Sequence, residues 1–330
     1  MLPDRATRTV FLGSGAFALP ILEAVAGHPA VELVGVVGAP DRPAGRGHRR
    51  REVPVAAIAR ERGWPLLQPA RLRAPEAVAT VLALRPELLV LADYGQIVPA
   101  SLLGAPDHGA LNVHPSLLPR HRGASPVTAA ILAGDREAGV TLIRMDAGVD
   151  SGPIVAQESV GISGDETAPE LEARLAELGA QVLSDAIGPW LGGAIEARPQ
   201  PVAGVTVTHP LRREDGRIEW TRPATEIERQ IRAYQPWPGS FTSSPIGTFA
   251  IWVAHPIGPG VASPAAPSDD GQGTPAGTVV ASDGGLAVTT GSGLLELLEA
   301  QPAGRRRMSG RELRNGYPSL LGQRVGADSP

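Results

Sequence analysis

Residues 111–126 read Leu-Asn-Val-His-Pro-Ser-Leu-Leu-Pro-Arg-His-Arg-Gly-Ala-Ser-Pro, a run that begins as a strand and continues as a loop. Proline disfavours helical backbone in the residue before it, so Pro115 makes His114 the last extended residue that we expect. Asn112 and His114 are two positions apart, and this spacing places both side chains on one face of a strand. An amide beside an imidazole can hold an oxyanion and handle a proton. Such a pair also occurs at strand ends that merely face solvent, so its role depends on the rest of the chain.

Strands and helices are predicted to alternate on both sides of this stretch. Apolar runs predict strands at 9–12, 31–37, 66–67, 88–91, 139–143 and 154–156, and helical spacing predicts helices at 16–26, 55–62, 76–84, 127–132 and 167–191. This alternation indicates an α/β fold with a doubly wound, mostly parallel sheet. Ligands of such sheets usually bind beyond the carboxyl ends of the strands, where Asn112 and His114 are expected.

A glycine motif follows the first predicted strand. Gly13, Gly15 and Ala18 match G-x-G-x-x-A, the weaker form of the dinucleotide-binding fingerprint. The acidic residue that would bind a ribose is poorly placed, because Glu32 comes too early and Asp41 lies in a predicted loop. A tight strand-to-helix turn explains the glycines, and a nicotinamide-dependent dehydrogenase stays open as a minor alternative.

The last third of the chain has a different pattern. Residues 192–205 are rich in Gly, Ala and Pro; a predicted helix at 224–233 and short strands at 249–253, 278–281, 286–289 and 294–298 follow. Closely spaced short strands suggest a small β-barrel. We therefore expect domains at 1–191 and 207–330, joined by a linker at 192–206. An insertion at 257–277, rich in Pro, Gly, Ser and Ala, is expected to be mobile.

Composition narrows the possible chemistry. The 330 residues include no cysteine and no lysine, which excludes cysteine nucleophiles, thiolate metal sites and lysine Schiff bases. The histidines show no metal-ligand spacing, so no metal site is predicted. The N-terminus does not resemble a signal peptide, and no run approaches the roughly 20 apolar residues of a membrane span. We expect a soluble cytoplasmic protein that is a monomer.

Arginine clusters are the features that favour a nucleic-acid partner. The formal net charge is −4, so nucleic acid would have to bind to local clusters rather than to a broad basic face. Residues 41–52 lack an apolar anchor and are expected to form a surface loop that carries Arg42, Arg46, Arg49, Arg50 and Arg51. A second cluster consists of Arg305, Arg306 and Arg307. Solvated charged loops are common, but the glycines and proline of the first cluster would also allow close approach to a phosphate backbone.

A candidate carboxylate lies in the loop at 145–153, which reads Met-Asp-Ala-Gly-Val-Asp-Ser-Gly-Pro. Asp before Gly is most often a turn residue, so Asp146 or Asp150 alone indicates little. If this loop folds back over the strand that carries Asn112 and His114, however, one of these carboxylates completes an acid–base trio.

Several separate stretches together resemble the folate-dependent formyltransferases. Residues 112–114, 116–119 and 122–123 are similar to one signature of that family, and residues 139–141 and 145–152 to a second. Residues 40–47, 236–238 and 301–304 resemble stretches of the branch that formylates methionyl-tRNA. These motifs occur in the family's order over roughly residues 10–317. The chain departs from the pattern at Gly13-Ser14-Gly15, at Asp93, where a small apolar residue is usual, and at Pro115.

The resemblance implies a Rossmann-like N-terminal domain, a C-terminal barrel of the OB type, and Asn112, His114 and Asp150 as catalytic trio. It implies a folate pocket lined by Tyr94, Gly95, Gln96, Ile97, Ser116, Leu117, Leu118 and Pro119. The implied reaction moves the formyl group of 10-formyltetrahydrofolate to the α-amine of methionine on initiator methionyl-tRNA. Asn112 and His114 would stabilise the oxyanion, and Asp150 would orient His114 and help to remove the amine proton. The arginine loop would reach the acceptor stem of the tRNA, and the C-terminal domain would hold the rest.

The same residues are also compatible with other functions. A relative with the same chemistry could formylate an amino sugar nucleotide or glycinamide ribonucleotide, or hydrolyse the folate. The arginine loop and the second domain favour tRNA among these substrates. A non-catalytic RNA-binding protein would use the barrel and both arginine clusters, and the complete Asn–His–Asp set speaks against that alternative.

Overall fold

The structure, a computed structural model, describes residues 5–44, 49–258 and 274–326 of the chain. Contacts between Cα atoms divide the chain into two compact units. The first consists of residues 1–130, 136–162 and 170–209, and the second of residues 131–135, 163–169 and 210–330. Segment 192–206, which was expected to be a linker, belongs to the first unit. Arg46 and most of the insertion at 257–277 lie outside the described residues.

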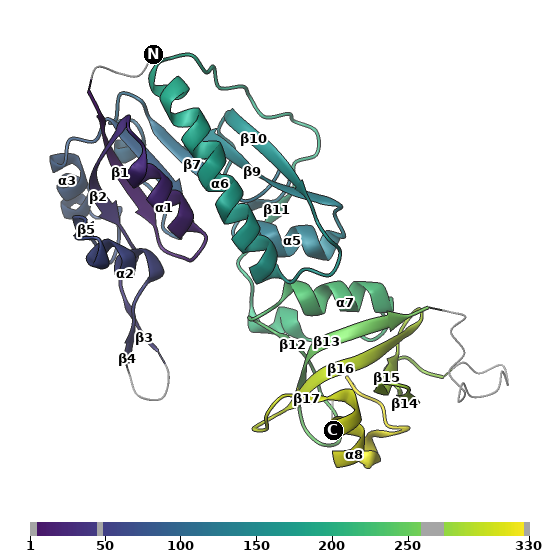
Figure 1. The fold of residues 1–330 in the computed structure, drawn as a ribbon. Coiled ribbons are helices and arrows are strands. Elements are labelled where there is room, and N and C mark those ends of the chain that lie inside the picture. Colours follow the sequence, from purple (N-terminus) through teal and green to yellow (C-terminus); the bar gives the residue numbers. More distant parts are fainter. Residues whose placement is uncertain (1–4, 45–48, 259–273, 327–330) are drawn as a thin grey trace. The chain divides into compact units, whose positions relative to one another are not determined.

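The first unit is built on a seven-stranded sheet with the strand order β10-β9-β7-β6-β1-β2-β5. Its strands are β1 (Thr7–Gly13), β2 (Val31–Val37), β5 (Leu66–Leu67), β6 (Leu88–Ala92), β7 (Ala110–His114), β9 (Glu137–Arg144) and β10 (Ile154–Gly161). Five of these strands, from β5 to β7 in the sheet order, run parallel, whereas β9 is antiparallel to both of its neighbours. The predicted doubly wound, mostly parallel α/β fold is confirmed (Figure 1).

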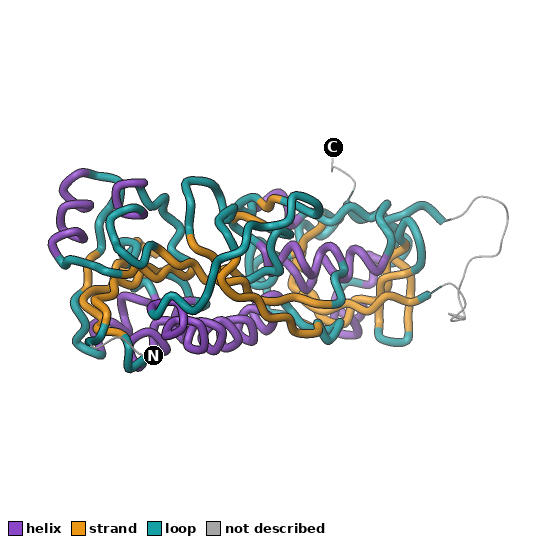
Figure 2. Tube along the Cα trace, turned by 90° about the horizontal axis from the view of Figure 1, so that it is seen from above, coloured by secondary structure: helices purple, strands orange, loops and turns teal. Residues whose placement is uncertain are grey.

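Helices cover both faces of this sheet (Figure 2). They are α1 (Ala18–Gly27), α2 (Pro54–Glu61), α3 (Pro75–Ala83), α4 (Ala100–Leu103), α5 (Pro126–Ala133) and α6 (Ala168–Leu191). A Cβ added to Gly179 of α6 would lie 2.9 Å from Val113 and 3.4 Å from Ile21 of α1, so α1 and α6 pack on the same face. On the opposite face, Ala110 of β7 belongs to a core that includes residues of α3 and α4. Because side chains alternate along a strand, Asn112 and His114 point to the same face as Ala110.

The arginine-rich segment, which we expected to be a surface loop, is partly β-strand. Its backbone forms a hairpin of β3 (Arg42–Ala44) and β4 (Arg49–Arg51), in which Arg42 is paired with Arg51. The prediction failed because a run of arginines and glycines has no alternation of apolar and polar side chains, the pattern that indicates a strand.

The second unit contains an antiparallel sheet of six strands, with the order β12-β13-β16-β15-β14 and with β17 beside β16. The strands are β12 (Ser240–Thr242), β13 (Phe249–Ile257), β14 (Val279–Ser282), β15 (Gly285–Thr289), β16 (Leu294–Pro302) and β17 (Met308–Ser309). They are accompanied by α7 (Ala224–Ala233), α8 (Gly310–Gly316) and the short 3₁₀ helices η1 (Arg213–Gly216) and η2 (Pro318–Leu320). Buried Trp220, Phe249, Leu295 and Leu313 belong to one core. The expected second β domain is therefore present, with β12, β17 and α8 as additions that the sequence pattern did not predict.

No helix in the described parts of the chain is long and apolar enough to cross a membrane.

Candidate active site

A cavity of about 530 Å³ lies at the carboxyl ends of β6 and β7. Small-molecule sites typically measure roughly 300–1,000 Å³. Leu91, Ile97, Leu103 and Met145 contribute apolar side chains to its wall, and the expected trio contributes polar ones. Since ligands of open α/β sheets bind at this end of the strands, the cavity is the candidate active site.

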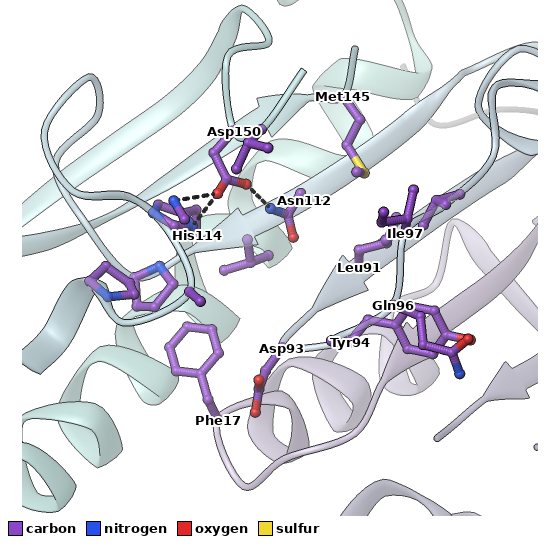
Figure 3. A pocket seen from close by; sticks show the side chains of 18 of the residues that line it. Phe17, Leu91, Asp93, Tyr94, Gln96, Ile97, Asn112, His114, Met145 and Asp150 are labelled. Atoms are coloured by element: carbon purple, nitrogen blue, oxygen red, sulfur yellow. Dashed lines mark hydrogen bonds and ion pairs between the residues drawn. The ribbon is translucent and has the colours of Figure 1, made fainter. Parts of the chain in front are cut away.

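The side chains of the trio meet in the wall of this cavity (Figure 3). Nδ2 of Asn112 donates to Oδ1 of Asp150 at 3.2 Å, and Nδ1 of His114 lies 3.6 Å from Oδ2 of Asp150. Asp146, the other candidate, accepts hydrogen bonds within its own loop, from the backbone N–H of Gly148 at 2.9 Å and from the hydroxyl of Ser151 at 2.8 Å. The loop therefore folds back over β7, and Asp150 is the carboxylate that contacts both side chains of the strand.

His114 is buried, and one of its ring nitrogens has a defined role. Its Nε2 lies 2.9 Å from the carbonyl oxygen of His121, which can only accept, so Nε2 carries a proton. The lone pair of the neutral ring is then on Nδ1, which faces Asp150. Burial lowers the pKa of His114, and the nearby negative charge of Asp150 opposes this effect in part. At neutral pH the ring is therefore neutral and offers Nδ1 as a proton acceptor next to a carboxylate.

Unusual backbone holds the carboxylate in place. Asp150 has φ of 47°, in the left-handed region that side chains other than glycine seldom adopt. Its Oδ2 also accepts a hydrogen bond of 2.9 Å from the backbone N–H of Gly123. Gly123 has φ of 102°, and a Cβ at this position would lie 2.3 Å from the carbonyl oxygen of Thr208. Only glycine fits here, so the glycine of the Arg-Gly motif serves to bring a backbone donor to Asp150.

Half of the residues expected to contact folate line the cavity. Tyr94, Gly95, Gln96 and Ile97 do so, and Ile97 is 78% exposed. The Gln96 side chain fixes this loop, because its Oε1 accepts from the backbone N–H of Leu72 at 2.9 Å. Its Nε2 also donates to a backbone carbonyl of the same neighbouring loop at 3.3 Å.

The other half lie outside the cavity lining. Ser116 is buried and its hydroxyl donates to the carbonyl of Arg120 at 2.7 Å. Leu118 is buried in a small cluster with two residues of β9 and β10, and Leu117 packs closely against Gly139. Pro119 follows a cis peptide bond. These four residues shape the turn after β7.

The comparisons with known proteins agree with this geometry. A family model described as "Formyl transferase" matches residues 7–187, and one described as "Formyl transferase, C-terminal domain" matches residues 210–318. The chain belongs to the formyltransferase family.

Relatives with curated names match this formyltransferase over nearly its whole length. A methionyl-tRNA formyltransferase of Roseiflexus sp. (strain RS-1) is 44% identical over 97% of this chain and 95% of the relative. A methionyl-tRNA formyltransferase of Methylococcus capsulatus is 39% identical over 97% of this chain and 99% of the relative.

Solved structures share the fold at much lower sequence identity. The N-formyltransferase of Helicobacter canadensis, in complex with folinic acid and dTDP-3-aminofucose, has a TM-score of 0.62 at 16% identity, over 88% of this chain and 99% of that one. HypX of Aquifex aeolicus, in complex with tetrahydrofolic acid, has a TM-score of 0.59 at 14% identity, over 96% of this chain and 48% of HypX.

The cavity of this formyltransferase is also lined by the carboxylates Asp93 and Glu172. Asp93 was expected only as a departure from the family pattern beside the folate loop, and Glu172 was not predicted. Asp93 is an exposed residue of the cavity wall, and its carboxylate lies against Gly15, where an added Cβ would be 1.8 Å from Oδ2. Desolvation raises its pKa to about 6, the negative charge of Glu172 adds to the rise, and a hydrogen bond from the backbone of Gly15 opposes it. Phe17, which also lines the cavity, was not predicted either, because a lone aromatic residue at the start of a helix resembles ordinary core.

The arginine clusters of this formyltransferase lie on different units. Arg42, Arg49, Arg50 and Arg51 belong to the β3–β4 hairpin of the first unit, and Arg46 lies outside the described residues. In the second unit, Arg305 follows β16, Arg306 pairs with Glu312 at 2.7 Å, and Arg307 stacks on Trp252 with 3.7 Å to the ring centroid.

Within the described residues of this formyltransferase, no group of three or more His, Asp or Glu side chains could hold a metal ion.

Proposed function

We propose that this protein transfers the formyl group of 10-formyltetrahydrofolate to the α-amine of methionine on initiator methionyl-tRNA. One observation carries the proposal. The Asp150 carboxylate contacts Asn112 and His114 in the wall of a small-molecule cavity, in a chain whose two parts both match formyltransferase models. The relatives that match nearly the whole chain are named for the methionyl-tRNA reaction, which favours this acceptor.

The proton that the amine loses would go to Nδ1 of His114. Nε2 is already the donor to the carbonyl of His121, so Nδ1 is the ring atom that can accept. Asp150, 3.6 Å away, would then stabilise the imidazolium that forms. An α-amine has a pKa near roughly 8, so a useful fraction of the acceptor is unprotonated at neutral pH. No covalent intermediate with the enzyme is required.

Asn112 would bind the formyl oxygen as negative charge develops on it. Its Nδ2 has two hydrogens, and the bond to Asp150 uses one of them. The other can donate into the cavity that Asn112 lines. Loss of one donor to an oxyanion typically costs about 2.7–4 kcal/mol of transition-state stabilisation.

The cavity suits a folate, because an apolar wall can pack on the flat bicyclic ring. 10-Formyltetrahydrofolate supplies the formyl carbon that the amine attacks. We assign its binding to Tyr94, Gly95, Gln96 and Ile97, which line the cavity. Ser116, Leu117, Leu118 and Pro119 would support the site by shaping the turn after β7.

The tRNA would be bound through the arginine clusters, Arg42, Arg46, Arg49, Arg50 and Arg51 in the first and Arg305, Arg306 and Arg307 in the second. Arginine recognises phosphate through charge and paired donors. We further propose that the protein acts in the cytoplasm as a monomer, with a catalytic domain at 1–191 and a tRNA-binding domain at 207–330.

Transfer of labelled formyl from 10-formyltetrahydrofolate tests the proposal directly. Parallel acceptors are methionine-charged initiator tRNA, uncharged tRNA, glycinamide ribonucleotide, an amino sugar nucleotide and water. We expect label only on the charged tRNA. Label on the amino sugar nucleotide instead would identify a small-molecule formyltransferase, and label on none of the amines would contradict formyl transfer altogether.

A further inference from the structure

The segment that follows α6 is hydrogen-bonded to the loops that carry the catalytic trio. At one end, the backbones of Arg198 and Ile154 exchange hydrogen bonds of 2.8 and 2.7 Å. At the other end, β11 (Val207–Thr208) pairs in parallel with β8 (Arg122–Gly123), which contains the backbone donor to Asp150. Gln200 lies between these two attachments.

The side chain of Gln200 makes four hydrogen bonds. Its Nε2 donates to the carbonyl oxygens of Asp150, at 2.7 Å, and Gly152, at 2.8 Å. Its Oε1 accepts from Nε of Arg122 at 3.1 Å and from Nη2 of Arg122 at 2.7 Å. Both amide hydrogens and both lone pairs are therefore used. The orientation of the amide is also defined, because a carbonyl can only accept and a guanidinium can only donate.

These four bonds join the two loops that hold the catalytic carboxylate. Asp150 lies on one of them, in a left-handed conformation that needs support from its surroundings. Gly123, which donates to the carboxylate at 2.9 Å, directly follows Arg122 on the other. Gln200 thus sets the position of the Asp150 backbone relative to Gly123, whose backbone N–H binds the Asp150 carboxylate.

Thr206, on the same segment, supports the imidazole in a similar way. Its Oγ1 accepts from the backbone N–H of His121 at 2.7 Å, and its carbonyl accepts from the backbone N–H of Arg122 at 2.9 Å. The carbonyl of His121 is the partner of His114 Nε2. The segment therefore contacts the supports of both the carboxylate and the imidazole.

We infer that Gln200 is a positioning residue for formyl transfer, which acts by holding the Asp150 loop against Arg122 so that the carboxylate stays in contact with His114. The inference rests on the proposed function. Gln200 does not line the cavity, so its effect on the reaction has to pass through Asp150.

Two variants test this role. Gln200→Glu keeps an acceptor for Arg122 but replaces the donor to two carbonyls with a repelling oxygen, and Gln200→Met removes all four bonds at similar length. Since a displacement of about 1 Å can reduce a rate by about 100-fold, we expect kcat to fall by about 10- to 100-fold. We expect KM for the formyl donor to change less than about threefold. Gln181→Glu, at an exposed glutamine of α6 in the first unit, is the matched control and should keep the wild-type kcat.

A second measurement separates positioning from general destabilisation. The pKa of His114, followed by NMR of histidine-labelled protein, should fall further in Gln200→Met, because the charge of Asp150 partly offsets the effect of burial in the wild type and this variant adds no charge of its own. Wild-type kcat, or reduced kcat with an unchanged His114 titration, would overturn the inference. If the wild-type protein transfers no formyl group to any amine, the proposed function fails, and the His114 titration still decides whether Gln200 positions Asp150.

Discussion

At the residue scale, the candidate active site is organised by the Asp150 carboxylate, which contacts three other residues. Asp150 accepts from Asn112 and Gly123 and faces His114, with distances of 3.2, 2.9 and 3.6 Å. A carboxylate that only ended a turn would contact its own loop, as Asp146 does. The arrangement of Asp150 instead orders an amide donor and a proton acceptor at the wall of one cavity.

Asp150→Asn should reduce kcat by about 100- to 10,000-fold, the usual contribution of general acid–base catalysis. The amide cannot stabilise the imidazolium of His114 as a carboxylate does. Asparagine tolerates left-handed backbone, so the fold should be retained. Single-turnover formyl transfer measures the loss of rate, and thermal unfolding checks that the fold is retained. Asp146→Asn, on the same loop, is the comparison, and a loss as large as that of Asp150→Asn would refute the assignment.

Asp93→Asn should stabilise the protein more at pH 7.5 than at pH 4.5. Folding raises the pKa of this carboxyl from 3.8 to about 6, so the folded state binds more protons between these values. The free energy of unfolding of the wild-type protein therefore falls as the pH rises through this window, and asparagine, which does not ionise, removes this decrease. Solvent in the cavity screens the charge, which limits the expected gain to about 1 kcal/mol.

Thermal unfolding at the two pH values measures this difference. The backbone of Asp93 has φ of 44°, which asparagine also tolerates, so the substitution changes the charge with little strain. Asp107→Asn, at an exposed position of the same unit, is the control. An equal shift in Tm at both pH values would show that Asp93 does not carry the effect.

At the element scale, buried strands and amphipathic helices could be predicted, and loops that meet in space could not. The β-branched run of β2 and the helical spacing of α7 were predicted with their observed bounds, because burial produces these patterns directly. The contact between Asn112 and Asp150 spans 38 positions and depends on how one loop folds back over β7. Gln200, in a segment that composition marked as a linker, gave no periodic signal.

Helix α8 had a sequence signal that was overlooked. Ser309 and Glu312 have the S-x-x-E spacing of a capping box, and both reciprocal hydrogen bonds are present. The hydroxyl of Ser309 accepts from the backbone N–H of Glu312 at 3.2 Å, and the carboxylate of Glu312 accepts from the backbone N–H of Ser309 at 2.8 Å.

Ser309→Ala should therefore destabilise the second unit by about 1 kcal/mol, the usual loss for an N-cap hydroxyl. Leu313 of the same helix is buried in the core of that unit, so fraying of α8 loosens packing as well. Urea unfolding and hydrogen exchange at the α8 amides measure the effect. Ser319→Ala, at an exposed serine nearby, should leave both unchanged. Unaltered exchange in Ser309→Ala would show that the cap does not stabilise the helix.

At the scale of the whole molecule, the formal net charge of −4 and the two arginine clusters make opposite contributions to binding of a polyanion. The overall charge repels tRNA, so attraction has to come from short-range contacts that salt can weaken. Two of the arginines in the second unit already have partners of their own, since Arg306 is paired with Glu312 and Arg307 stacks on Trp252. The β3–β4 hairpin carries three consecutive arginines, Arg49, Arg50 and Arg51, and we expect this run to supply a large share of the electrostatic binding.

Replacement of Arg49, Arg50 and Arg51 together by glutamine should weaken tRNA binding and reduce its dependence on salt. Each phosphate contact contributes about −0.7 to −0.9 to the slope of log K against log salt concentration, so the loss of three contacts should reduce the slope by about 2 to 3. Titrations at several salt concentrations measure both quantities, with Arg73→Gln as an exposed control outside the clusters. We propose that these arginines bind tRNA and that other residues bind the folate, so KM for the formyl donor should stay the same. A slope equal to that of the wild type would place the phosphate contacts elsewhere on the molecule.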